Sequence, residues 1–127
     1  MTATALDSSS LIAYLEGRDR ADTRLVDAAL HRGDAVLPPV VVAEVLSQPG
    51  LPPEVVDLID AVAMLELRSG YWKRVGETRS RVLAKGRRAR LTDALIAQAC
   101  IDHDVPLITH DADFRHFAAV SALRLLP

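Results

Sequence analysis

Residues 3–15 read ATALDSSSLIAYL, and this stretch decides the fold. The apolar run 3–6 predicts a short buried strand, which ends at Asp7. Three serines then offer helix caps, and the apolar residues 11–15 predict a helix that stops at Gly17. A strand followed directly by a helix, with an acid at the junction, indicates an α/β sheet whose ligands bind at the carboxyl ends of its strands.

Strands and helices continue to alternate along the rest of the chain. The patterns predict four more strands, at 35–37, 64–67, 107–109 and 123–126. They predict five more helices, at 21–31, 40–46, 54–62, 70–84 and 92–102. Such alternation implies parallel pairing with right-handed crossovers, and nearly continuous apolar strands fit a sheet covered on both faces. We therefore expect a three-layer α/β/α sandwich with a central parallel sheet of four to five strands.

The composition is typical of a globular protein and unlike a disordered one, with 50% hydrophobic and 25% charged residues. The length fits one domain spanning residues 1–127. Aromatic residues make up only 4%, so we expect an aliphatic core. The net charge of -2 gives no support for a passive nucleic-acid coat, which is usually strongly basic. It leaves a nuclease open, because active-site acids offset basic residues elsewhere.

The sequence shows no feature of a secreted or membrane protein. Cys100 is the only cysteine, so no intrachain disulfide can form, which is compatible with a reducing compartment. The N-terminus lacks the charged and apolar regions of a signal peptide. No apolar run approaches the roughly 20 residues that span a bilayer. We expect a soluble cytoplasmic protein without a membrane partner.

Four acids occupy positions that the predicted fold would bring to one end of the sheet. Asp7 and Asp111 follow predicted strands, Glu44 lies on the helix after the second strand, and Asp93 lies near the start of a later helix. Each has a simpler explanation as a helix cap, an exposed helix residue, a macrodipole partner or a turn residue. Carboxylates about 4 Å apart repel by roughly 4 kcal/mol at an effective dielectric of about 20. Convergence would therefore need a cation, and hard oxygen ligands suit Mg²⁺ or Mn²⁺.

Four segments carry these acids in a recognisable order. They are LDSSSLI at 6–12, VAEVL at 42–46, LTDALIA at 91–97 and LITHDADF at 107–114. With these segments the chain resembles the PIN-domain endoribonucleases, in particular the VapC-like toxins of type II toxin–antitoxin systems. Each motif alone is weak, but the ordered set spans the whole chain and is fairly specific.

The resemblance implies a function as well as a fold. It implies an endoribonuclease that hydrolyses RNA phosphodiester bonds with one or two Mg²⁺ or Mn²⁺ ions. It also implies a homodimer and a small antitoxin protein that blocks the site. The catalytic, metal-binding acids of the family correspond to Asp7, Glu44, Asp93 and Asp111, and a less regular fifth metal ligand corresponds to Asp113.

Four more residues are candidates for substrate binding. Ser8 and Thr109 match small hydroxyl residues that often border the site in the family that the chain resembles. Arg87 and Arg88 belong to a basic run that directly precedes the segment of Asp93. This run either holds RNA phosphates beside the metals or forms a solvated loop.

Two other functions stay open. A PIN-like module that binds RNA or a partner without cutting would keep the fold, although the intact set of acids argues against it. A phosphoacceptor receiver domain would share the doubly wound topology. It needs an acidic pair after the first strand and a lysine after the last, whereas only Asp7 follows the first strand and Lys73 and Lys85 lie mid-chain. Whether the enzyme is a toxin or an RNA processor depends on gene context, where a small antitoxin gene directly upstream would indicate a toxin.

Overall fold

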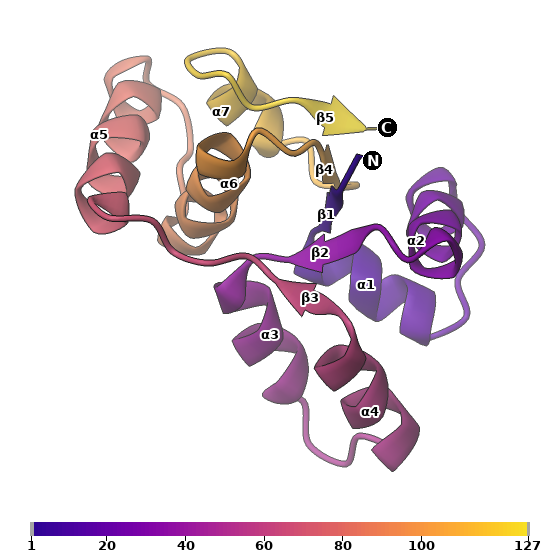
Figure 1. The fold of residues 1–127 in the computed structure, drawn as a ribbon. Helices are drawn as coiled ribbons and strands as arrows, with labels where there is room; N and C mark the ends of the chain where they lie inside the picture. Colours follow the sequence, from indigo (N-terminus) through magenta and orange to yellow (C-terminus); the bar gives the residue numbers. More distant parts are fainter. Residues whose placement is uncertain (1, 127) are drawn as a thin grey trace.

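The computed structural model describes residues 2–126, which form a sheet of five parallel strands in the order β3-β2-β1-β4-β5 (Figure 1). The strands are β1 (Thr4–Leu6), β2 (Ala35–Leu37), β3 (Ala63–Met64), β4 (Leu107–Ile108) and β5 (Leu125–Leu126). Ala5 in the central strand pairs with Val36 on one side and Leu107 on the other. The predicted parallel α/β fold is confirmed.

Seven helices connect these strands within the described residues. They are α1 (Ser8–Leu15), α2 (Ala21–Arg32), α3 (Pro39–Leu46), α4 (Pro53–Ala61), α5 (Tyr71–Ala84), α6 (Leu91–His103) and α7 (Phe114–Ala118). Helices α1 and α2 pack together on one side of the sheet, and α5 and α6 pack together on the other, while α3 and α4 lie beyond the β3 edge (Figure 1). None of the helices in residues 2–126 is long and apolar enough to cross a membrane.

Local chemistry explains where several elements begin and end. Helix α3 starts at Pro39, whose fixed φ suits the first helical position. Proline lacks a backbone N–H, but at this position an N–H would have no acceptor within the helix. Helix α2 ends at Gly33, whose φ of 75° lies in the left-handed region that terminates helices. Helix α6 is buried over most of its length because it is apolar on nearly all sides, so its few polar residues are held inside the protein.

The structure differs from the expected elements in three places. The third strand is Ala63–Met64 and not 64–67, although the N–H of Leu65 still bonds to the carbonyl of Leu37 at 2.9 Å. The fifth strand is Leu125–Leu126 and is likewise shorter than 123–126. Helix α7 was not expected at all, since five residues are too few for a helical pattern to stand out.

The core is mainly aliphatic, as expected, but helix α7 adds two aromatic residues to it. Phe114 and Phe117 are the largest of the fully buried side chains in the described residues. Their rings lie 6.3 Å apart between centroids, a distance at which aromatic pairs attract. Their spacing of three puts both rings on the same face of the short helix, which fixes the segment that follows β4.

We predict that Phe117→Ala lowers the free energy of unfolding by about 3–5 kcal/mol, because the close-packed core cannot fill the cavity left by the ring. The measurement is urea denaturation followed by circular dichroism. Arg115→Ala, an exposed change in the same helix, is the matched control and should alter stability by no more than about 0.5 kcal/mol. Equal losses in the two variants would show that α7 does not anchor the core.

Candidate metal centre

Asp7 and Asp111 lie at the same edge of the sheet because they follow two neighbouring strands. The chain runs from β1 towards β2 and β3 on one side, and β4 and β5 lie on the other, so strand order reverses between β1 and β4. Ligands bind at such switch points in open parallel sheets. The N–H of Asp7 bonds to the carbonyl of Ile108 at 3.1 Å, which fixes the two strand ends relative to each other.

Asp7 is buried at the start of α1, with 3% of its surface exposed. Although it occupies the N-cap position, its side chain makes no capping hydrogen bond. Its Oδ2 instead accepts hydrogen bonds from the hydroxyls of Thr109 at 2.8 Å and Ser9 at 2.9 Å. Burial raises the pKa of Asp7 above its ordinary value of 3.8, the two hydroxyls oppose the rise, and the negative charge of Asp111 adds to it. The carboxylate is therefore held for something other than capping.

Three more carboxylates form a tight group that we call the acidic cluster. One oxygen from each of Asp93, Asp111 and Asp113 lies within 4.8 Å of the other two. Asp111 Oδ1 accepts the N–H of Asp113 at 2.9 Å, and the N–H of Asp111 donates to Thr109 Oγ1 at 3.0 Å. Thr109 is buried and bonded to both Asp7 and Asp111, so it positions these two acids.

Asp93 is the acid of the cluster whose pKa is raised by burial and by its neighbours. It is only 7% exposed, and its Oδ2 is buried without a hydrogen-bond partner among the described residues. Burial raises the pKa of Asp93 to about 6, and the charges of Asp111, Asp7 and Asp113 add to the rise while Arg90 opposes it. A buried anion without a donor is costly unless a proton or a cation neutralises it.

Glu44 is held near the carboxyl ends of the strands by a hydrogen bond from Ser8. It is not part of the acidic cluster. Ser8 Oγ donates to Glu44 Oε1 at 2.7 Å, which joins α1 to α3 across 36 positions of sequence. Ser8 is buried and directly follows Asp7, so the bond brings Glu44 to the neighbourhood of that acid. Ser8 thus positions Glu44, and the substrate contact expected of Ser8 stays a prediction.

The two candidate arginines differ in their relation to the cluster. Arg88 Nε lies 3.9 Å from Asp113 Oδ2, with 66% of the arginine side chain exposed. Arg87 is exposed, and within residues 2–126 its side chain forms no ion pair. Arg88 therefore approaches the acids, whereas no ion pair joins Arg87 to them within residues 2–126.

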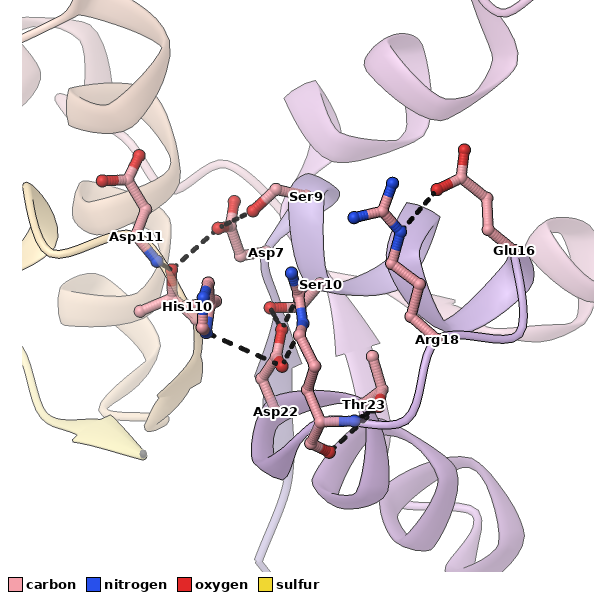
Figure 2. A network of polar contacts seen from close by, with 11 residues as sticks. Asp7, Ser9, Ser10, Glu16, Arg18, Asp22, Thr23, His110 and Asp111 are labelled. Carbon is pink, nitrogen blue, oxygen red and sulfur yellow. Dashed lines mark hydrogen bonds and ion pairs between the residues drawn. The ribbon is translucent and has the colours of Figure 1, made fainter.

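The sequence patterns missed a second polar network beside the first (Figure 2). Ser9, which bonds to Asp7, is one of three consecutive serines that look alike as helix caps. Asp22 is 1% exposed and accepts a hydrogen bond from Ser10 Oγ at 2.8 Å. A signal for Asp22 did exist: it lies four and seven positions before the buried Val26 and Ala29, so it shares the apolar face of α2.

The acids suit a hard divalent cation. All side chains of the acidic cluster offer oxygen, which Mg²⁺ and Mn²⁺ prefer. The unpartnered oxygen of Asp93 is buried against this group, where a cation would supply the missing partner. The raised pKa values of Asp7 and Asp93 have the same origin, because both carboxylates lack a nearby positive charge that outweighs burial.

Comparisons with known proteins agree with this fold. The sequence model of the PIN domain family matches residues 4–120. A chain in the crystal structure of VapBC2 from Rickettsia felis bound to a DNA fragment from their promoter superposes with a TM-score of 0.74. It is 18% identical, and the match covers 98% of each chain. No curated protein sequence matches this chain.

A second solved structure is similar. It belongs to VapBC-5 from Mycobacterium tuberculosis, a member of the VapBC family of toxin–antitoxin systems, with a TM-score of 0.65 and 20% identity. The match covers 99% of this chain and 98% of that chain. At these identities the likeness establishes the fold across the whole chain.

We predict that Asp93→Asn stabilises the metal-free protein at neutral pH. The folded protein binds the proton of Asp93 more tightly than the unfolded chain, since the folded pKa is about 6 against an ordinary 3.8. Ionisation therefore destabilises the fold progressively as the pH rises between these two values, and the amide escapes this loss. In EDTA-treated protein at about pH 7.5 the melting midpoint of Asp93→Asn should lie several degrees above that of the wild type. Each kcal/mol gained in the free energy of unfolding should raise the midpoint by about 3–4 °C.

The same melts at about pH 4 should show little difference, because Asp93 is then protonated in the folded wild type. Asp60→Asn removes an exposed carboxylate from α4 and should leave the midpoint unchanged at both pH values. A wild type that is as stable as Asp93→Asn at neutral pH without metal would mean that the acids do not repel one another as the geometry requires.

Proposed function

The chain belongs to the PIN domain family, and from this membership and the geometry of the acids we propose that it is a metal-dependent endoribonuclease. One observation carries the proposal. A buried Asp93 oxygen without a partner lies in a group of three carboxylates, which is a poor arrangement for stability and a good one for holding Mg²⁺ or Mn²⁺. The family match supports the nuclease class.

The residues take distinct roles in this proposal. Asp93, Asp111 and Asp113 would hold the ion, and Asp7 lies within electrostatic reach of Asp93 and Asp111. A bound divalent ion supplies a water of lowered pKa and stabilises charge on the scissile phosphate. The Thr109 hydroxyl donates to Asp7 Oδ2 and accepts the N–H of Asp111, so it fixes these two acids relative to each other. Within the described residues Asp7 Oδ1 accepts no side-chain hydrogen bond.

Glu44 would join this set through Ser8, which follows Asp7 and donates to Glu44 Oε1. Within the described residues Glu44 Oε2 accepts no hydrogen bond, so it would be available to help hold a second ion. Because Mg²⁺ keeps several of its waters and takes few protein carboxylates, five acids provide enough oxygens for one ion or two. The reaction is in-line hydrolysis of a phosphodiester, with both the attacking and the leaving oxygen near the acids.

We further propose that the protein is the toxin of a toxin–antitoxin pair and acts in the cytoplasm. Chains of two VapBC toxin–antitoxin structures share its fold over nearly their full length. Three exposed apolar side chains, Trp72, Leu83 and Leu91, line one pocket together. A contiguous exposed apolar surface is typical of a site that a partner covers. This surface fits a homodimer or a small antitoxin.

We predict that the purified protein cuts RNA only with Mg²⁺ or Mn²⁺ and that Asp7→Asn and Asp93→Asn each slow cleavage by at least about 100-fold, because each removes charge that holds the ion. The measurement is sequencing of new 5′ ends in total cellular RNA. Asp60→Asn, which removes an exposed acid of helix α4, is the charge-matched control. Undiminished cleavage by either site variant would remove the assignment.

The same proteins separate cleavage from binding alone. If Mn²⁺ raises the melting midpoint of the wild type but no RNA is cut, the chain is a PIN-like module that binds without cutting. If Mn²⁺ neither shifts the melt nor supports cleavage, even with RNA present, the acids do not form a cation site.

The toxin role makes a separate prediction in cells. Expression of the wild type should arrest growth of the host, and Asp93→Asn at equal abundance should not, because arrest depends on cleavage. Co-expression of the small protein encoded next to this gene should restore growth. Arrest by both forms of the protein would point to a cause other than cleavage, and absence of arrest with intact RNA cleavage would favour an RNA-processing role.

A further inference from the structure

A pocket of about 410 Å³ opens beside Asp111, on the side of the acidic cluster that faces α1 and α2. Its lining combines basic, apolar and acidic side chains and one hydroxyl: Arg18, Arg20, His110, Ile12, Ala13, Glu16, Asp111 and Ser9. We call it the arginine pocket. Its volume lies in the range of sites that hold one small ligand, so it can take a single nucleotide but not a duplex.

Arg20 is fixed in this pocket by a buried carboxylate. Its Nε and Nη2 donate to the two oxygens of Asp22 at 3.0 and 2.9 Å. Asp22 is 1% exposed and is also bound by Ser10. Within residues 2–126 no hydrogen bond uses Nη1 of Arg20. One edge of the guanidinium is therefore locked, and the other is available to an oxyanion.

Asp22 holds two parts of the pocket together. Burial opposes its ionisation, but hydrogen bonds from Arg20 and Ser10 outweigh burial and keep the pKa of Asp22 below 3.8. His110 Nδ1, from the segment after β4, lies 3.9 Å from Asp22 Oδ1 (Figure 2). A buried ion pair contributes little to stability compared with apolar residues of similar size. Stability alone therefore does not explain an ion pair at this position.

Arg18 adds a second cation that is free to move. Arg18 Nε lies 3.3 Å from Glu16 Oε1, and the two side chains are 61% and 53% exposed (Figure 2). Exposed pairs of this kind contribute about 0–1 kcal/mol. Arg18 can thus leave Glu16 for a phosphate at little cost, whereas Arg20 stays in place.

We propose that the arginine pocket binds a phosphate-bearing nucleotide of single-stranded RNA next to the bond that is cut. Arg20 is the fixed phosphate ligand, Arg18 closes on the same phosphate, and Asp22 is the positioning residue. The apolar lining from Ile12 and Ala13 offers a surface for the ribose or base. The identity of the ligand as RNA rests on the proposed nuclease function.

The position of the pocket gives the path of the RNA. Asp111 both lines the pocket and belongs to the acidic cluster. Arg88 approaches Asp113, another acid of the cluster. A strand bound both in the pocket and at Arg88 would therefore have its phosphates held by arginines where it passes the acids. Phosphate contacts of this kind fix the register of a nucleic acid.

The test measures binding of a short fluorescein-labelled RNA of random sequence by anisotropy, in millimolar Ca²⁺, at several salt concentrations. Arg20→Ala and Arg18→Ala should each raise Kd by up to about tenfold. Each should also lower the slope of log Kd against log salt by about 0.7, the value for one lost phosphate contact to a single strand. Arg24→Ala, an exposed arginine on α2 that does not line the pocket, has the same charge change and should match the wild type.

Two measurements keep the result interpretable. Arg18 is an exposed side chain, so its removal tests the pocket even if Arg20→Ala unfolds because Asp22 loses its partner. Asp22→Asn leaves every arginine in place and should weaken RNA binding, because Arg20 is no longer locked. Circular dichroism melts of each variant check the fold.

Unchanged Kd and salt slope in Arg18→Ala and Arg20→Ala, or equal losses in Arg24→Ala, would overturn the proposal. RNA cleavage by the wild type in Mn²⁺ is assayed in parallel. Cleavage together with unaffected binding in the pocket variants rejects the pocket and keeps the nuclease. Weakened binding in those variants without any cleavage by the wild type keeps the pocket and rejects the nuclease.

Discussion

The forced proximity of like charges at the strand ends governs the rest of this structure. Asp93, Asp111 and Asp113 approach within 4.8 Å, and one oxygen of Asp93 is buried without a donor. Two unit charges about 4 Å apart repel by several kcal/mol at protein-like dielectric. The hydroxyls of Thr109 and Ser9 stabilise the charged form of Asp7 in part, but they do not outweigh its burial. The fold maintains a negative site that only a proton or a cation can compensate.

The sheet and the buried helix α6 make this arrangement possible. Adjacent parallel strands bring Asp7 and Asp111 to one edge, although the hydrogen bond between Thr109 and Asp7 spans 102 positions of sequence. Helix α6 is apolar on nearly all sides, so its packing against the core is strong enough to hold Asp93 where it is least stable. Hydrophobic burial, which is not directional, thus offsets a directional electrostatic penalty.

Much of the fold was predictable from sequence, because it depends on local patterns. The order of strands and helices follows from apolar periodicity, and the second strand was expected at its observed bounds, 35–37. The site was less accessible. Asp113 was expected as a less regular fifth metal ligand, but the bond between Ser8 and Glu44 and the separation of Glu44 from the tight group depend on side-chain directions across distant segments. The pair of Asp22 and Arg20 was missed because a charged helix residue is normally read as solvated, and only its register with Val26 and Ala29 marks it as buried.

The strand order also has a consequence for protein synthesis. Of the described strands the central strand β1 is synthesised first, but one of its two neighbours, β4, begins only at Leu107. A nascent or prematurely terminated polypeptide that ends before residue 107 carries Asp7, Glu44 and Asp93 but lacks Thr109, Asp111 and Asp113. Because N-terminal segments emerge and begin to fold first, Asp7 and Asp93 can meet Asp111 and Asp113 only after residue 113 has been made. Shorter products therefore lack part of the proposed cation site.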